Sequence, residues 1–111
     1  MKIHEQKQGA VTILKPIGPL AGQDAPDFKA QTLAALRNTL GRLVVDMSAI
    51  AYVDSAGLEV LVDISDEMDR FGQCLKLAGV NKTVREALSL TELAALFEQF
   101  DDVNTAIRSF L

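Results

Sequence analysis

The run at residues 43–47 constrains the fold more than any other feature of this sequence. Its residues, LVVDM, are mainly apolar, include two adjacent valines and show no alternation between polar and apolar positions. This pattern is typical of a strand near the middle of a sheet, where both faces are covered. A few residues later, apolar side chains recur at helical spacing and the stripe ends at Gly72, which predicts a helix. The stripe consists of Leu58, Leu61, Ile64 or Ser65, Met68 and Phe71. The segment Asp54-Ser55-Ala56-Gly57 therefore lies where a buried strand passes into a helix.

The residues before this strand predict a hairpin and a helix. Two short strand-like runs, residues 3–6 and 11–14, flank Gln8-Gly9, which indicates a tight turn. Asp24, followed by a proline in the first turn, is the expected N-cap of the first helix, and Gly41 is its expected end. The apolar stripe of this helix consists of Phe28, Thr32, Leu33, Leu36 and Leu40.

The residues after Gly72 repeat the alternation of strand and helix. Residues 74–78 form an expected strand, Asn81 caps a short helix, and Leu96 and Phe97 indicate one more strand. Asp101 and Asp102 precede a final amphipathic helix. Strands that alternate with helices predict an α/β fold with right-handed crossovers, and the leading hairpin makes the sheet mixed. We expect a single domain over residues 1–111, a sandwich with a sheet of four to five strands and helices packed mainly on one face.

Composition argues against several classes of function. The net charge of −4 and the absence of a Lys or Arg cluster argue against a nucleic-acid partner. No apolar run approaches the roughly 18 residues that span a bilayer, and the first residues lack the pattern of a secretory signal. We therefore expect a cytoplasmic protein without membrane insertion.

The sequence offers no set of residues for catalysis or for binding a metal ion. His4 is the only histidine and Cys74 the only cysteine, so neither a metal site nor a Cys-His nucleophile pair is expected. Ser55 is not enclosed by the Gly-x-Ser-x-Gly motif of serine hydrolases. We expect neither an enzyme nor a bound cofactor.

Ser55 has two interpretations from the pattern alone. It is placed to be the N-cap of its helix, its hydroxyl meeting free backbone amides. The same position would hold a phosphoryl group near the positive end of the helix dipole, with Asp54 repelling it. Glu59 stands four residues after Ser55, one position beyond the spacing of a capping box. Gly57 would let a partner approach closely.

Taken together, these segments resemble the STAS domain family, and specifically the stand-alone bacterial anti-sigma factor antagonists. The resemblance rests on Leu43-Val44-Val45-Asp46, which leads through Ile50 and Tyr52 into Asp54-Ser55-Ala56-Gly57-Leu58. Gly18-Pro19-Leu20 and Leu75-Lys76-Leu77 fall at matching places, as does the closing helix.

The resemblance implies a partner-switching function. In such proteins, the serine after the motif aspartate, here Ser55, is phosphorylated by a serine/threonine kinase of the histidine-kinase-like ATPase type that also serves as the anti-sigma factor. The unphosphorylated antagonist binds this kinase and releases a sigma factor, phosphorylation breaks the complex, and a metal-dependent phosphatase resets it. The partner surface that we expect comprises Asp24, Asp54, Ser55, Ala56, Gly57, Leu58 and Val60.

Two positions depart from the family pattern. Ala56 stands where many relatives carry a second hydroxyl, so any modification would be single. Ala21 stands where the family has a carboxylate close to the acceptor serine, and Asp24 is the nearby candidate to substitute for it. The alternative function is a constitutive, non-phosphorylated STAS module of a transporter or signalling scaffold, in which Ser55 only caps its helix.

The expected second helix also has a strongly acidic side. Asp63, Asp66, Glu67 and Asp69 either complement a basic groove on a kinase or form a solvated helix face.

Overall fold

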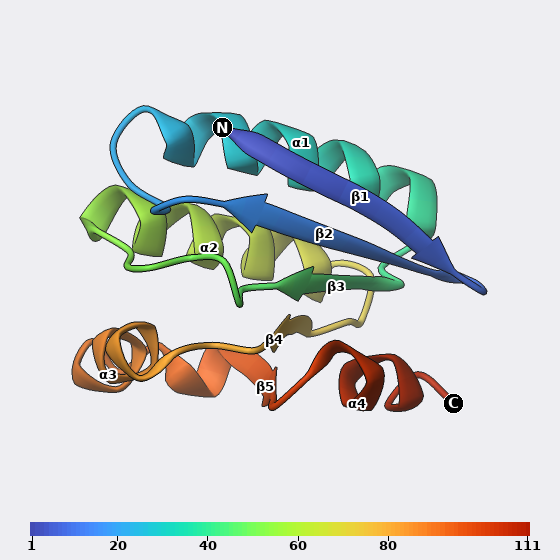
Figure 1. Cartoon of the computed structure of the whole chain (residues 1–111). Helices are drawn as coiled ribbons and strands as arrows, with labels where there is room; N and C mark the ends of the chain where they lie inside the picture. Colours follow the sequence, from blue (N-terminus) through green and yellow to red (C-terminus); the bar gives the residue numbers. More distant parts are fainter.

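A computed structural model describes residues 1–111, which form a five-stranded sheet with four α-helices and one short 3₁₀ helix. The elements follow in the order β1 (Lys2–Gln8), β2 (Val11–Ile17), α1 (Asp24–Thr39), β3 (Leu43–Asp46), α2 (Ser55–Asp69), β4 (Leu75–Ala78), α3 (Lys82–Leu90), η1 (Ala94–Leu96), β5 (Phe97–Phe100) and α4 (Val103–Arg108). Figure 1 shows this order along the chain.

The sheet has the strand order β1-β2-β3-β4-β5. The hairpin strands β1 and β2 pair antiparallel, and every later neighbour pairs parallel. The mixed sheet of four to five strands predicted from the sequence is therefore confirmed, and it has five strands. Residues 43–47 indeed supply the middle strand, because β3 lies between β2 and β4.

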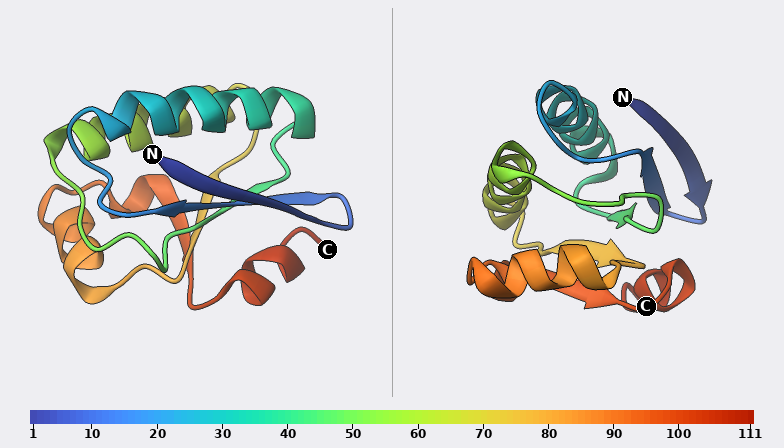
Figure 2. Two further views of the ribbon diagram at one scale, coloured as in Figure 1. Left: turned by 45° about the horizontal axis from the view of Figure 1, so that its top comes forward. Right: turned by 60° about the vertical axis from the view of Figure 1, so that its left-hand side comes forward.

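The two larger of three apolar cores cover the two faces of the sheet. The larger one, with 17 buried residues, joins side chains of α1, α2 and α3 to one face. The smaller one packs α4 against the other face, and Figure 2 shows α4 on the side of the sheet away from α1 and α2. Within β3, Val45 belongs to the larger core and Val44 to the smaller one. This strand is thus covered on both faces, as its mainly apolar pattern without alternation predicted.

Side-chain caps begin three of the helices. Asn81 accepts a hydrogen bond from the amide of Val84 at 2.8 Å, and Asp102 accepts one from Thr105 at 2.7 Å. Both caps were predicted, and both satisfy amides that a helix end leaves free. Asp54 caps α2 in the same way.

Helix α1 differs from the prediction at both ends. Gln23, not Asp24, is its N-cap, and Asp24 is the first helical residue. At the other end, Leu40 takes a left-handed conformation with φ of 53° and is 71% exposed, so it lies outside the apolar stripe. The chain turns here through two successive residues with positive φ, Leu40 and Gly41, which lifts the Leu40 side chain out of the core.

The buried face of α2 is rotated relative to the predicted stripe. It consists of Gly57, Val60, Leu61, Ile64 and Met68. Phe71 follows the helix and is 44% exposed. The rotation arises because α2 packs against α1 as well as the sheet, and the sequence period alone does not specify that second neighbour. None of the helices is long and apolar enough to cross a membrane.

Candidate functional site

The candidate site lies at the carboxyl end of the parallel strands, where two connections run side by side. The segment between β2 and α1 pairs with the segment between β3 and α2 through a parallel bridge of Leu20 and Val53. The amide of Leu20 donates to the carbonyl of Tyr52 at 3.0 Å, and the amide of Asp54 donates to the carbonyl of Leu20 at 3.3 Å. These bonds fix the segment that carries Asp54 and Ser55.

Asp54 holds the two connections together. One carboxylate oxygen accepts from the amide of Gly57 at 2.8 Å, and the other accepts from the amide of Gly22 at 2.9 Å. These backbone donors, Gly57 first and then Gly22, hold the pKa of Asp54 below its ordinary value because they stabilise the ionised carboxylate. The carboxylate is thus a fixed negative group at the start of α2.

Ser55 is the first residue of α2, and the expectation that it caps this helix is wrong. Asp54 has the extended backbone of a cap, with φ of −101° and ψ of −172°, and its side chain makes the capping bond. The Ser55 side chain is exposed, and its hydroxyl forms no hydrogen bond within the chain. No backbone carbonyl accepts from the amides of Ser55 and Ala56. Ser55 therefore presents a free hydroxyl at a helix amino terminus, where the neighbouring Ala56 amide interacts with the Asp54 carboxylate.

Gly57 is required by close packing inside the molecule. It is buried, and a Cβ atom at this position would clash with the backbone carbonyl oxygen of Leu20. The space that the missing side chain leaves is therefore filled by the Leu20 backbone. The expectation that Gly57 lets a partner approach is corrected by this contact.

Val60 is also turned inward. It is 7% exposed and belongs to the larger core, because the buried face of α2 includes its position. The expectation that Val60 lies off the apolar face and is available to a partner is therefore wrong. Ala56 and Leu58 are partly exposed and pack against the edge of the same core.

Asp24 is the first residue of α1, and its carboxylate lies near the terminal amine of Met1. Its carboxylate is 3.5 Å from the terminal amine of Met1, and it forms no hydrogen bond with Ser55. At position 21, Ala21 precedes Gly22, whose amide binds Asp54. In this structure, Asp54 is consequently the carboxylate adjacent to Ser55, and it is already engaged by two amides.

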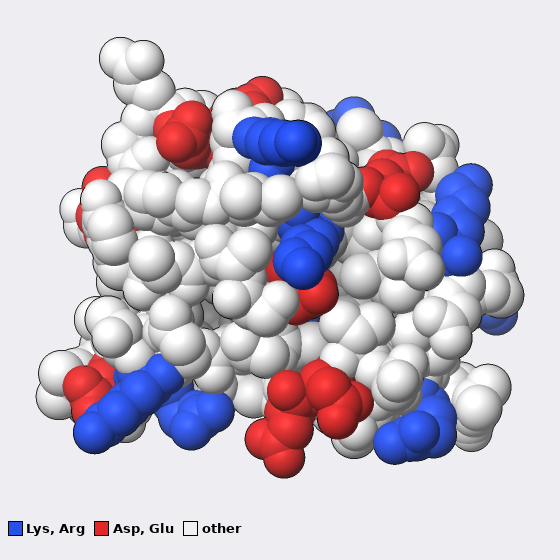
Figure 3. All heavy atoms as spheres, viewed as in Figure 1, with Lys and Arg blue, Asp and Glu red and all other residues white.

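The acidic side of α2 is partly neutralised by neighbours. Asp63 pairs with Lys29 of α1 at 3.0 Å, and Glu67 lies 3.5 Å from Arg70. Asp66 and Asp69 are exposed and form no ion pair. On the face drawn in Figure 3, acidic and basic side chains are interspersed, without a large patch of either sign.

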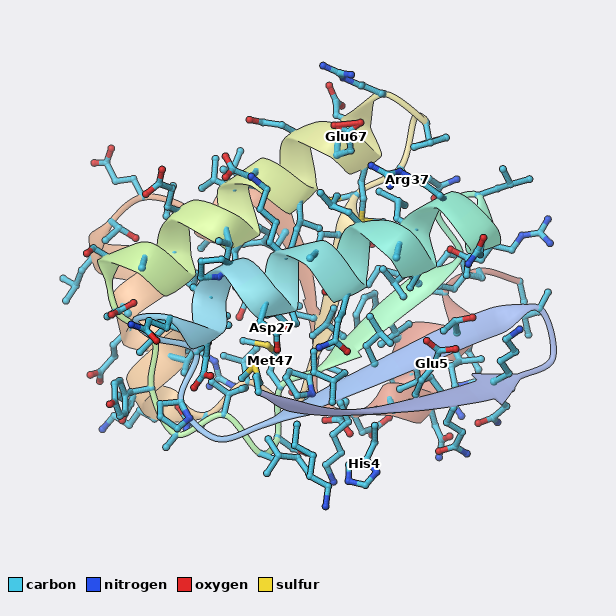
Figure 4. The ribbon with its side chains drawn as sticks, turned by 90° about the horizontal axis from the view of Figure 1, so that it is seen from above. His4, Glu5, Asp27, Arg37, Met47 and Glu67 are labelled. Carbon is cyan, nitrogen blue, oxygen red and sulfur yellow. The ribbon has the colours of Figure 1, made fainter.

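The residues considered for metal or nucleophile chemistry lie apart. Figure 4 shows His4 on the outer side of the hairpin, away from α1 and α2. The thiol of Cys74, which directly precedes β4, lies 3.3 Å from the carbonyl oxygen of Leu96. The structure contains no group of three or more His, Cys, Asp or Glu side chains that is arranged to hold a metal ion.

Sequence reasoning missed two members of the site, Leu20 and Gly22. Both contribute backbone groups, namely a carbonyl that packs on Gly57 and an amide that binds Asp54. Backbone groups leave no signature in side-chain type, so only the pairing of the two connections identifies them.

The family assignment follows from comparison with known proteins. The sequence profile of the STAS domain matches residues 2–106. This chain belongs to the STAS domain family. The fold and the position of the Asp54-Ser55 motif agree with the resemblance drawn from the sequence.

Three solved structures give the degree of similarity to known proteins. A candidate anti-sigma factor antagonist from Thermotoga maritima shares 25% identity with a TM-score of 0.88, covering 96% of this chain and 92% of its own. The anti-sigma factor antagonist SpoIIAA in its unphosphorylated form shares 14% identity with a TM-score of 0.81, covering 98% and 96%. A sulfate transporter family protein from Wolinella succinogenes shares 22% identity with a TM-score of 0.78, covering 92% and 85%. The last two identities show the shared fold alone.

Proposed function

We propose that this chain is an anti-sigma factor antagonist that acts by partner switching, with Ser55 as its phosphorylation site. The unphosphorylated form binds an anti-sigma serine/threonine kinase of the histidine-kinase-like ATPase type and thereby releases a sigma factor or an equivalent target. Phosphorylation at Ser55 breaks the complex, and a metal-dependent serine phosphatase restores it. The chain is a cytoplasmic substrate and binding protein in this scheme, not an enzyme.

The state of Ser55 is the observation that carries the proposal. Its side chain is exposed and its hydroxyl is unengaged, while Asp54 performs the capping of α2. A serine that is needed only as a cap would have its hydroxyl on a backbone amide. The free hydroxyl supports access by a kinase.

Charge gives the switch a physical mechanism. A phosphoryl group adds nearly two negative charges, which the amino terminus of the 15-residue helix α2 stabilises through its dipole. The same group lies next to the Asp54 carboxylate, which already accepts two hydrogen bonds. Phosphorylation therefore changes the local charge sharply while Asp54 keeps the segment in place.

Incubation with ATP and the kinase encoded beside this chain tests the phosphorylation step. We expect a mass increase of one phosphoryl group, which Ser55→Ala abolishes. Ser48→Ala is the matched control, because Ser48 is also exposed and lies in the same connection between β3 and α2. The proposed switch would be contradicted if the mass did not increase, or if the increase also occurred in the Ser55→Ala variant.

Binding by the phosphomimetic variant tests the charge mechanism. Ser55→Asp should weaken kinase binding by about tenfold or more, whereas Ser55→Asn, which has nearly the same shape without the charge, should retain most of the affinity. Raised ionic strength should reduce the difference between the two variants. Equal affinities for Asp, Asn and wild type would favour the constitutive binding module instead.

A further inference from the structure

A cleft lies between α1 and the β1–β2 hairpin. Its volume is about 590 Å³, within the range of small-molecule sites. The hairpin turn and the residues that lead from α1 into β3 form one end of it, whereas Ser55 follows the other end of β3. Figure 1 shows the hairpin turn and the carboxyl end of α1 on the same side of the molecule, away from the start of α2. The cleft therefore shares no residue with the Asp54-Ser55 segment.

Thr12 is a buried polar side chain in the floor of this cleft. Its residue is 3% exposed and lines the cleft, yet its hydroxyl forms no hydrogen bond within the chain. The hydroxyl oxygen itself keeps some access to solvent, since Thr32 Oγ1 is the only fully buried side-chain oxygen or nitrogen without a partner. A ligand in the cleft can therefore reach the Thr12 hydroxyl and replace water there with a hydrogen bond of its own.

Two cationic side chains flank Thr12. Lys7 is its cross-strand partner in the hairpin, and the carbonyl of Arg42 on the other side accepts from the Thr12 amide at 3.0 Å. Both side chains line the cleft, and neither takes part in an ion pair. Glu5 lies two pairs further along the hairpin, opposite Leu14, so the cationic groups gather at the turn end. In Figure 4, Glu5 lies on the side of β1 that faces α1, whereas its neighbour His4 lies on the outer side.

Apolar side chains also line the cleft, together with the polar Gln31 and Asn38 of α1. Ile3 and Leu14 of the hairpin face Ala34 and Ala35 of α1, whose small side chains leave the space open. Leu40 lies at the rim with φ of 53° and 71% exposure. A leucine there is unfavourable in two ways, because a left-handed backbone disfavours a side chain and water surrounds its apolar surface. An apolar ligand in the cleft would remove the second of these costs.

We propose that this cleft binds a small organic anion with an apolar body. The anionic group contacts Lys7, Arg42 and the Thr12 hydroxyl, and the body lies along the apolar side chains under Leu40. The proposal does not depend on the proposed function of Ser55, since the cleft shares no residue with the Asp54-Ser55 segment.

Titration with decanoate, followed by isothermal calorimetry and by backbone amide shifts in NMR spectra, tests the proposal. We expect saturable binding at one site, with shifts at Thr12, Ala35, Leu40 and Arg42 and none at Ser55. Decanol has the same chain without the charge, and inorganic phosphate has the charge without the chain. Both should bind at least about tenfold more weakly. If decanol bound as tightly as decanoate, the anionic part of the proposal would be wrong. If phosphate bound as tightly as decanoate, the apolar part would be wrong.

Variants at the two ends of the cleft separate binding from folding. Thr12→Val and Lys7→Gln should each weaken decanoate binding, by about threefold to tenfold, whereas Glu5→Gln should strengthen it because a repelling charge is removed. Leu40→Asn should weaken binding while raising or preserving the midpoint of thermal unfolding, since asparagine tolerates the left-handed conformation.

Filling the cleft gives the final control. Ala34→Leu places a larger side chain in the cleft and should abolish binding, whereas Ala30→Leu lies one turn earlier on α1, outside the cleft, and should not. Absence of decanoate binding to the wild type, or binding that Ala34→Leu leaves unchanged, would overturn the proposal.

Discussion

Asp54 and Gly22, which are 32 residues apart in the sequence, are joined by a hydrogen bond of 2.9 Å from the Gly22 amide to the Asp54 carboxylate. The same carboxylate caps α2 through Gly57. One side chain thus fixes both the start of a helix and the neighbouring connection, and Ser55 is presented from the resulting rigid corner.

The first prediction concerns pH. Because the pKa of Asp54 is lowered in the folded protein by the amides of Gly57 and Gly22, this group stabilises the fold at pH values above its unfolded pKa of 3.8. That contribution is lost as the pH falls through the lower, folded pKa. Asp54→Asn should therefore be less stable than wild type at pH 7, and the difference should shrink below about pH 4.

Urea denaturation of both proteins at a series of pH values measures this difference. Asp66→Asn is the control, because the exposed Asp66 carboxylate forms no hydrogen bond or ion pair. A difference between wild type and Asp54→Asn that stays constant from pH 7 to pH 3 would contradict the assignment of Asp54 as the charged anchor.

The second prediction separates Ser55 from Asp54 in stability. The Ser55 hydroxyl makes no hydrogen bond in the chain, so Ser55→Ala should change the free energy of unfolding by no more than about 0.5 kcal/mol. Asp54→Ala should be clearly destabilising, because it removes two hydrogen bonds to backbone amides. If denaturation found Ser55→Ala to be the more damaging of the two, Ser55 would be the true cap.

The third prediction concerns Gly57. An alanine would bring its Cβ against the Leu20 carbonyl and force the two connections apart, at a cost of at least about 2 kcal/mol in unfolding free energy. Glu59→Ala, on the exposed side of the same helix, should lower the free energy of unfolding by only about 0.3 kcal/mol. Thermal or chemical denaturation distinguishes them, and a tolerated Gly57→Ala would show that the connections can move apart.

The fourth prediction concerns Thr32, which is fully buried in α1 with a hydroxyl that has no partner. Thr32→Val keeps the shape and removes the unsatisfied group, so it should stabilise the protein by about 1 kcal/mol. Thr32→Ala should destabilise it instead, because it also leaves a cavity. Equal effects of Val and Ala on the urea midpoint would contradict the idea that the hydroxyl itself is unfavourable.

The fifth prediction concerns Ala21, which stands at a position where the family resemblance implies a carboxylate. The next residue, Gly22, binds Asp54, so position 21 lies beside the segment of Ser55. Ala21→Asp should raise the rate of Ser55 phosphorylation about fivefold, because it places a carboxylate near the Ser55 hydroxyl that can accept its proton. Ala21→Asn is the control without charge, and a slower rate for Ala21→Asp than for Ala21→Asn would show that repulsion from Asp54 dominates.

The order and type of the elements were predictable because they follow from local patterns. The mainly apolar run at residues 43–47, which shows no alternation, predicted a strand covered on both faces, and the caps at Asn81 and Asp102 were predicted from residue type and position. The Asp54-Ser55 motif was likewise placed correctly between strand and helix. These features depend on periods of two and 3.6 residues and on the free amides at helix ends, which act within a few residues.

The tertiary structure decided which of two adjacent residues does which task. Aspartate and serine are both good N-caps, so the sequence left Ser55 as a possible cap, but the pairing of Leu20 with Val53 and the bond from Gly22 fix Asp54 in that position. The burial of Val60 and of Gly57 depends likewise on α1 and on the Leu20 backbone, which lie far away in the sequence. The sequence alone thus determined that a serine stands at the start of a helix, whereas long-range backbone contacts decided that its hydroxyl is free.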